Sequence, residues 1–326
     1  MIMRTTVGLT IGKSLNYMMG ILLVMQLTAC NKGEDIHLPS DGPGNGNGSG
    51  QVQEAQLELI VSKKGSLLGQ NTWYDGNTLG IFLTEGNLGS PYLGDKDSYY
   101  NIKATMLAGT WYLKPEEVLL KDKEAVVYAY SPYENGVDPF AVPVIAGGEV
   151  DYMFGTHLES QKAVDKDNET AAIEMQHALA LIDFNVRKNH NFKGQAMLQQ
   201  IALESVTDSI KLPVKGTMDI MTGKLTPDGY GRYCLDNLQQ VLPDEYRDSC
   251  TYRMMVMPRD NAQDEVQLTI MVNGNRISLP LDADNDWQQG VRNTYNIVFE
   301  GTDLRIEKIE IAPWREINIE GQINGK

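Results

Sequence analysis

An alternation of apolar and polar residues with a period of two dominates this chain. It is clearest in two runs that flank a turn at Asn273-Gly274: Val266, Leu268, Ile270 and Val272 before it, and Ile277, Leu279 and Leu281 after it. Asn and Gly tolerate the positive φ angles of a tight turn, and each run keeps its apolar residues on one face. The pattern therefore predicts a β-hairpin over residues 266–281.

The same alternation recurs along the chain, whereas helical patterns are scarce. It includes Leu57, Leu59 and Val61, then Val126, Tyr128 and Tyr130, and finally Tyr295, Ile297 and Phe299. Such runs predict half-buried strands. Residues 115–120 could form one helical turn, and residues 194–203 a short helix or a strand. Many short strands between Gly, Asn and Asp turns predict an all-β fold of β-sandwich type in more than one domain.

Two interior stretches bear on how the chain divides. Residues 159–170 are the most polar interior stretch and predict a boundary near Thr170, with an N-terminal domain over residues 51–170 and a C-terminal domain over residues 171–326. Just beyond, the apolar positions change parity near Leu181. That change predicts a β-bulge or a long strand buried on both faces.

The N-terminus has the features of a bacterial lipoprotein signal. Arg4 and Lys13 precede an uncharged stretch, and its apolar part, residues 17–27, is too short to span a membrane, which takes about 20 residues. The sequence Leu-Thr-Ala-Cys ending at Cys30 resembles a lipobox. We expect residues 1–29 to be a signal peptide and Cys30 to become the lipidated N-terminus; the alternative is an ordinary signal peptide that ends before a cysteine.

A flexible tether and an acidic surface are expected in the mature chain. Residues 41–50 read DGPGNGNGSG, so residues 30–50 predict a spacer between lipid and folded domain. Removing residues 1–29 takes away two basic residues and leaves 26 basic and 43 acidic side chains, a balance of −17. Such a charge repels phosphate backbones, which excludes nucleic acid as a partner.

Two cysteines remain after Cys30. Cys234 follows the turn-rich residues 227–231, and Cys250 begins a strand-like run that ends at Val256. In an oxidising compartment they are candidates for one disulfide. Two buried free thiols are the alternative, because the sequence does not show whether their Cα atoms lie within about 7 Å.

Six short stretches follow one another in an order that is typical of a known family. They are Leu27–Cys30, Asn77–Phe82 (NTLGIF), Val127–Tyr133 (VYAYSPY), Asp151–Gly155 (DYMFG), His177–Phe184 (HALALIDF) and Ile309–Trp314 (IEIAPW). Together they resemble the fimbrillin family of Bacteroidota, including its Mfa-like members, which are subunits and accessory proteins of type V pili. In these stretches Trp314 and the tyrosines Tyr128, Tyr130 and Tyr133 are expected to pack in the core or at strand edges.

The resemblance implies two transthyretin-like β-sandwich domains in tandem, and a role as a structural, tip or anchor component of a pilus that functions in adhesion. It also implies a location at the surface of the cell outer membrane, held by the lipid at Cys30, or in the fimbrium. Partners would be other pilus subunits, joined by donor-strand exchange: a protease removes the first strand, and a strand of another subunit fills the groove.

The resemblance also points to a processing site. Polymerising members are cut after a basic residue that follows the first strand, and Lys63-Lys64 is the basic pair at this place. No arginine lies between Arg4 and Arg187, which departs from the arginine site of the best-known pilins. Two alternatives therefore stay open: Lys63 and Lys64 form a solvated turn before Gly65, and the chain is a permanently lipidated anchor.

No motif predicts catalysis, a metal or a cofactor. The chain lacks HExxH, GxSxG and a P-loop. Asp282, Asp284 and Asp286 begin like a calcium loop, but Trp287 replaces the turn glycine and Asn293 replaces the final glutamate. We expect no enzyme. The alternative to a pilus component is a non-polymerising surface lipoprotein that binds a glycan or another host or bacterial ligand.

Overall fold

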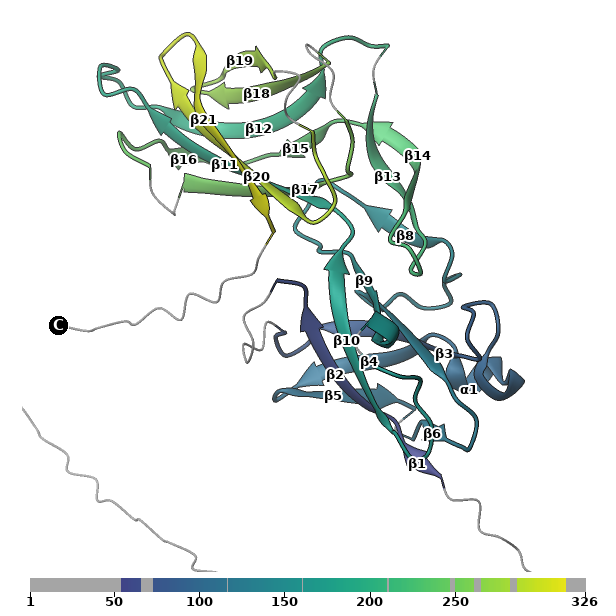
Figure 1. The fold of residues 1–326 in the computed structure, drawn as a ribbon. Helices are drawn as coiled ribbons and strands as arrows, with labels where there is room; N and C mark the ends of the chain where they lie inside the picture. The colour runs from purple at the N-terminus through teal and green to yellow at the C-terminus, as the bar shows by residue number, and fades with distance from the viewer. Residues whose placement is uncertain are drawn as a thin grey trace, which may run out of the picture. The chain divides into compact units, whose positions relative to one another are not determined.

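The protein is described by a computed structural model over residues 54–65, 73–115, 117–159, 161–209, 211–246, 250–260, 265–281 and 286–314. Within these ranges nearly all regular structure is strand, as predicted (Figure 1). Three short helical segments accompany the strands: η1 (Tyr92–Gly94), α1 (Lys96–Tyr99) and η2 (His157–Glu159). The signal peptide, Cys30 and the tether predicted for residues 1–50 lie outside the described residues.

The first part of the chain builds a seven-stranded sheet. In spatial order its strands are β2 (Glu58–Lys63), β10 (Thr170–His177), β9 (Met153–Thr156), β7 (Val126–Ser131), β3 (Thr78–Thr84), β4 (Ile102–Leu107) and β5 (Thr110–Lys114). Neighbours are antiparallel except β2 and β10, which are parallel. A separate short pair joins β1 (Ala55–Gln56) to β6 (Leu119–Leu120).

Three further sheets follow. The four-stranded sheet has the order β17 (Thr251–Val256), β11 (Ala180–Lys188), β20 (Val291–Phe299) and β21 (Leu304–Pro313). The five-stranded sheet contains β15 (Tyr233–Leu235), β12 (Met197–Ser205), β18 (Val266–Val272) and β19 (Asn275–Pro280), with β16 (Gln240–Val241) paired to β12. The three-stranded sheet has the order β14 (Leu225–Gly231), β13 (Leu212–Met218) and β8 (Val142–Ile145).

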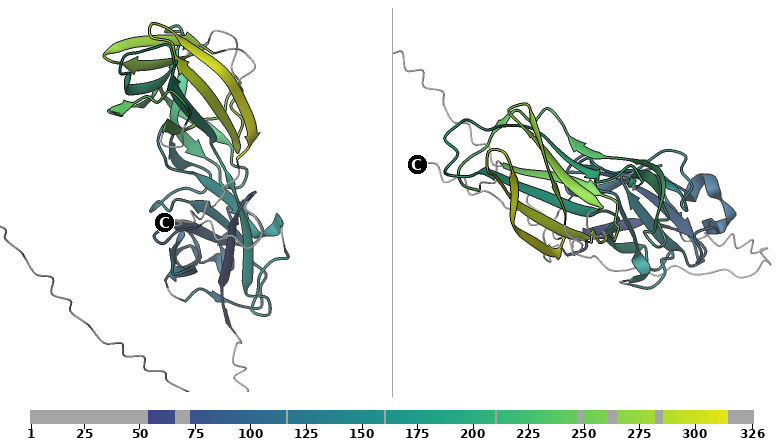
Figure 2. Two further views of the ribbon diagram at one scale, coloured as in Figure 1. Left: turned by 90° about the vertical axis from the view of Figure 1, so that its left-hand side faces the viewer. Right: turned by 90° about the horizontal axis from the view of Figure 1, so that it is seen from above.

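The four-stranded and five-stranded sheets form a sandwich (Figures 1 and 2). Phe184, Tyr295 and Ile297 from the former share one buried cluster with Leu203 and Leu268 from the latter. Side chains that alternate along each strand fill the space between two such layers. The predicted hairpin is confirmed, because β18 and β19 pair antiparallel and their turn residues Asn273 and Gly274 have φ of 51° and 78°.

Strand β7 is buried on both faces, which corrects the half-buried strand predicted from Val126, Tyr128 and Tyr130. These three side chains belong to the same large cluster as the sandwich core, whereas Val127 and Ala129 belong to a second cluster around the seven-stranded sheet. The reason is tertiary: β7 lies in the interior of the sheet between two hydrophobic clusters. An alternation of apolar and polar residues therefore does not show whether one face of a strand is buried or both.

The change of parity near Leu181 coincides with a change of sheet. Residues 173–186 do not form one strand with a bulge: β10 ends at His177 and β11 begins at Ala180. The chain passes here from the seven-stranded to the four-stranded sheet, and β11 is buried on both faces from Ala180 to Phe184, so of the two predicted causes only burial on both faces is present. The division into two domains near Thr170 stays a prediction.

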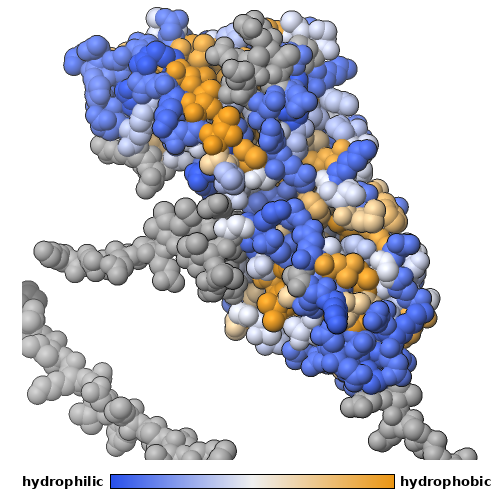
Figure 3. Space-filling view, viewed as in Figure 1, coloured by the Kyte–Doolittle hydropathy of each residue, from blue (hydrophilic) through white to orange (hydrophobic). Residues whose placement is uncertain are grey.

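The two weak helical patterns are strand or irregular chain. In the described part of residues 115–120 the regular structure is β6, and residues 194–203 contribute to β12, so the strand alternative is the right one. No helix among the described residues has the length and apolar character needed to cross a bilayer. The face drawn in Figure 3 is mostly hydrophilic, with hydrophobic residues in narrow bands.

Candidate processing and assembly site

The first described segment, residues 55–63, packs one face into the protein. Leu57 is buried, and Leu59 and Val61 pack half-buried against the cluster of the seven-stranded sheet, whereas Ile60 is exposed. The alternation predicted from the sequence is thus confirmed. Strand β2 forms one edge of the sheet, with β10 as its neighbour.

Backbone hydrogen bonds hold both ends of β2 against the sheet. Glu58 N donates to Glu169 O (2.9 Å), and Lys64 N donates to Met175 O (2.8 Å). If residues 55–63 were removed, the edge of β10 would lose its neighbour and the apolar positions under Leu57, Leu59 and Val61 would open. An edge with unpaired backbone groups is a template for another strand.

The two lysines of the predicted processing site differ sharply in environment. Lys63 ends β2 with only 10% of its side chain exposed; its Nζ lies 3.9 Å from Asp151 Oδ2 and 4.8 Å from the centre of the Trp73 ring. Lys64 is exposed in the turn that follows, where its Nζ donates to Gln176 Oε1 (3.0 Å) and Gly65 has φ of 80°. Of the two, Lys64 therefore offers the accessible peptide bond that a protease needs.

Asp151 connects this turn to the end of the last described strand. The imidazole Nδ1 of His177 lies 2.9 and 3.0 Å from the two carboxylate oxygens of Asp151. The His177 ring stacks on Trp314 with 3.7 Å between centroids and 7° between planes, and Trp314 N donates to Gly290 O (2.8 Å). Residues distant in the sequence thus meet beside Lys63.

The packing role expected for Trp314 is confirmed, because its side chain is buried, and His177 is buried beside it. The sequence did not reveal that Asp151 pairs with His177. Its only signal was an acidic residue next to a strand, and the contact depends on β9 and β10 lying side by side. Donor-strand exchange leaves open whether residues 315–321, after Trp314, are the strand that this chain donates; they lie outside the described residues, as does Cys30.

The structure contains no disulfide between Cys234 and Cys250, both of which lie in its described part. The reason is their placement. Cys234 lies on β15 in the five-stranded sheet, where its Sγ donates to Asp236 Oδ1 (3.2 Å), whereas Cys250 is buried just before β17 of the four-stranded sheet. Burial and the Asp236 carboxylate raise the pKa of the Cys234 thiol to about 11, so it stays protonated and unreactive near neutral pH.

A non-polymerising glycan-binding protein would need exposed aromatic residues as a platform for sugar rings, and Trp73, Tyr74 and Trp111 do not form one. Trp73 is 6% exposed and packs edge to face on Trp111 at 5.3 Å, while Tyr74 is exposed. A stacking platform needs an open ring face. Among the described residues no group of three or more His, Cys, Asp or Glu side chains is arranged to hold a metal ion.

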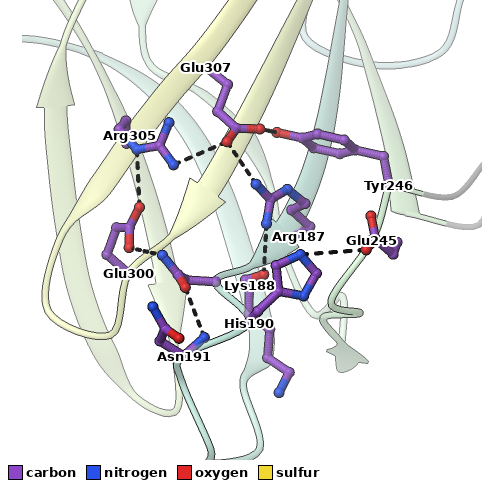
Figure 4. Close-up of polar contacts among 10 residues, drawn as sticks. Arg187, Lys188, His190, Asn191, Glu245, Tyr246, Glu300, Arg305 and Glu307 are labelled. Atoms are coloured by element: carbon purple, nitrogen blue, oxygen red, sulfur yellow. Dashed lines mark hydrogen bonds and ion pairs between the residues drawn. The ribbon is translucent and has the colours of Figure 1, made fainter.

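A second polar cluster lies at the surface of the four-stranded sheet and ties its last hairpin to neighbouring segments (Figure 4). Glu307 on β21 accepts from Arg187 Nη2 (2.7 Å), Tyr246 Oη (2.7 Å) and Arg305 Nη2 (3.0 Å). These donors hold the pKa of the Glu307 carboxyl below its usual range, the Tyr246 hydroxyl most of all. Desolvation and the nearby carboxylate raise the pKa of Tyr246 to about 12.

Glu307→Gln is expected to lower the melting temperature at pH 7. A carboxyl with a depressed pKa stabilises the fold above the usual titration range of glutamate, around pH 4, and this contribution is lost as pH falls through the folded-state pKa. The difference between wild type and variant should therefore shrink between pH 7 and pH 3 in thermal denaturation. Glu149→Gln, at an exposed carboxylate, is the control; a gap that is constant with pH would contradict the assignment.

These observations define a class of protein: an all-β, sheet-stacked molecule in which β2 forms the edge of the seven-stranded sheet and the described polar clusters join structural segments. The chain matches the model of the fimbrillin-like family over residues 68–314, and it belongs to that family.

Solved structures of low sequence identity share the fold. A protein assigned to cell adhesion from Bacteroides uniformis aligns with a TM-score of 0.61 at 16% identity, over 80% of this chain and 99% of that one. A second, from Bacteroides ovatus, has a TM-score of 0.58 at 16% identity, over 82% and 99%. A fimbrial protein from Bacteroides vulgatus has a TM-score of 0.50 at 13% identity, over 79% and 99%. No curated protein matches the chain.

Proposed function

We propose that this protein is a lipid-anchored component of a type V pilus that joins other subunits by strand exchange at the groove now filled by residues 55–63. Membership of the fimbrillin-like family supports a pilus role at the cell surface. A lipid at Cys30 would hold the chain on the outer membrane, and residues 30–50 would act as a flexible spacer between the membrane and the folded part.

The proposal depends mainly on how residues 55–63 pack and on where they lie in the sheet. This segment contributes Leu57, Leu59 and Val61 to the core, yet it forms the sheet edge and ends at an exposed Lys64. A strand of another subunit with the same apolar spacing could replace each of its contacts. Backbone hydrogen bonds to β10 would provide affinity, and the alternating side chains would provide specificity.

The test is mass spectrometry of the N-terminus of the protein recovered from cell surfaces. We expect two species: a precursor that begins at diacylated Cys30 and a trimmed form that begins at Gly65. Trimmed protein should occur in high-molecular-mass polymers and the precursor should not. A lipidated Cys30 terminus alone would instead identify a permanent anchor or a binding lipoprotein with an intact first strand. An unlipidated start other than Gly65 would contradict both the anchor and the processing site.

A further inference from the structure

A polar pocket of about 570 Å³ opens beside the five-stranded sheet, away from the first strand. Its walls come from β14, from the end of β12 with the loop that follows, and from β18 and β19. Its volume lies in the range of pockets that bind small molecules. We propose that this pocket binds a neutral, hydroxyl-rich saccharide.

The floor of the pocket is an ordered arrangement of hydrogen-bonding groups. Glu204, whose side chain is 10% exposed, accepts from Arg232 Nη1 (2.9 Å) and from Arg276 Nη2. Thr269 Oγ1 donates to the same carboxylate (3.2 Å). One buried carboxylate thus fixes two guanidinium groups, each about half-exposed, and their other N–H groups can donate to a ligand. Donors held in advance cost less entropy on binding.

One wall supplies an open aromatic ring and an acceptor. Asp228 and Tyr230 lie two residues apart on β14, and both line the pocket. Tyr230 is 55% exposed, and within the described part of the chain neither it nor Asp228 has a side-chain hydrogen bond or ion pair. An exposed ring beside an unpaired carboxylate is the combination that a pyranose uses: its C–H face packs on the ring, and its hydroxyls donate to the carboxylate.

The charge of the lining selects the class of ligand. Three basic and three acidic side chains line the pocket: Lys211, Arg232, Arg276, Glu204, Asp208 and Asp228. Their formal charges cancel, so the pocket has no excess of positive charge to attract phosphate or an acidic sugar. Tyr230 is the one large side chain with an apolar face, which disfavours a lipid. Sugar hydroxyls both donate and accept, and they fit a lining that offers both.

The test is affinity electrophoresis of the full chain, purified in detergent, through gels that contain mannan, galactomannan, xyloglucan or starch, with polygalacturonate and heparin as acidic probes. At least one neutral polysaccharide should retard the wild type. Tyr230→Ala should weaken that binding about tenfold, since the ring contributes most of the stacking surface, and Tyr230→Phe should retain it. Tyr112→Ala is the matched control, because Tyr112 is also 55% exposed on a strand but lies elsewhere, on β5.

Three results would overturn the proposal: no retardation by any neutral polysaccharide, retardation by the acidic probes alone, or equal retardation of wild type and Tyr230→Ala. Circular dichroism checks that Tyr230→Ala is folded, and if it is not, Asp228→Ala decides by the same criteria. Saccharide binding needs neither trimming nor polymerisation. Its failure would therefore leave the strand-exchange proposal intact, and the failure of strand exchange would leave this pocket intact.

Discussion

Gly80→Ala is expected to lower the free energy of unfolding by about 2–3 kcal/mol, the upper part of the range for overpacked interiors. Gly80 lies on β3 directly opposite Tyr130 on β7. A methyl group at Gly80 would collide with the Tyr130 ring and lie 2.8 Å from Asn101 Oδ1. The ring cannot easily move away, because Tyr130 Oη is hydrogen-bonded to Asn101 Oδ1 (2.8 Å) and to Glu134 O (2.8 Å).

Urea denaturation measures this effect, and Gly89→Ala is its control. A methyl group added at Gly89 would have no other atom within 4 Å, and φ of Gly89 is not positive. The same substitution there should therefore change the free energy of unfolding by less than about 0.5 kcal/mol. Equal stability of the two variants would show that the Tyr130 ring can move to another position in the core and so avoid the added methyl group. The comparison also explains why NTLGIF contains Gly80 and VYAYSPY contains Tyr130. Because Gly80 on β3 has no side chain, the Tyr130 ring of the neighbouring strand β7 can lie over it.

Local patterns were sufficient to predict the strands but not the number of their buried faces. The hairpin of β18 and β19 needs only a turn and two alternating runs, all of which are adjacent in the sequence. The burial of β7 on both faces depends instead on a second cluster from other parts of the chain. Likewise, the parity change near Leu181 left a bulge and burial on both faces as alternatives, because the sequence does not show where a chain leaves one sheet for another.

The candidate site was predicted in part for the same reason. Lys63 and Lys64 were proposed as a processing pair because the family resemblance implies a cut after a basic residue that follows the first strand. Their difference in burial was not predicted, because it results from Asp151 and Trp73 packing around one of them. The saccharide pocket left no local signal either: Glu204, Tyr230 and Arg276 come from three strands and meet only in the folded chain.

Lys64→Gln is expected to abolish trimming, whereas Lys63→Gln is expected to leave trimming in place and destabilise the fold. The proposed cut after Lys64 uses an exposed side chain, and the variant removes its charge at little structural cost. In Lys63→Gln the partly buried Asp151 carboxylate loses a cation, and Trp73 loses its cation–π partner. That loss should cost about 1–2 kcal/mol.

The two variants are compared by the N-terminal mass of surface protein and by thermal denaturation. In Lys64→Gln the Gly65 terminus and the polymers should disappear together, with an unchanged melting temperature. Trimming that persists in Lys64→Gln but is lost in folded Lys63→Gln would move the cut to the buried residue, and β2 would then have to detach before the protease acts. Since Lys63 is hydrogen-bonded into the sheet edge, that outcome would make strand release the first step of assembly and proteolysis the second.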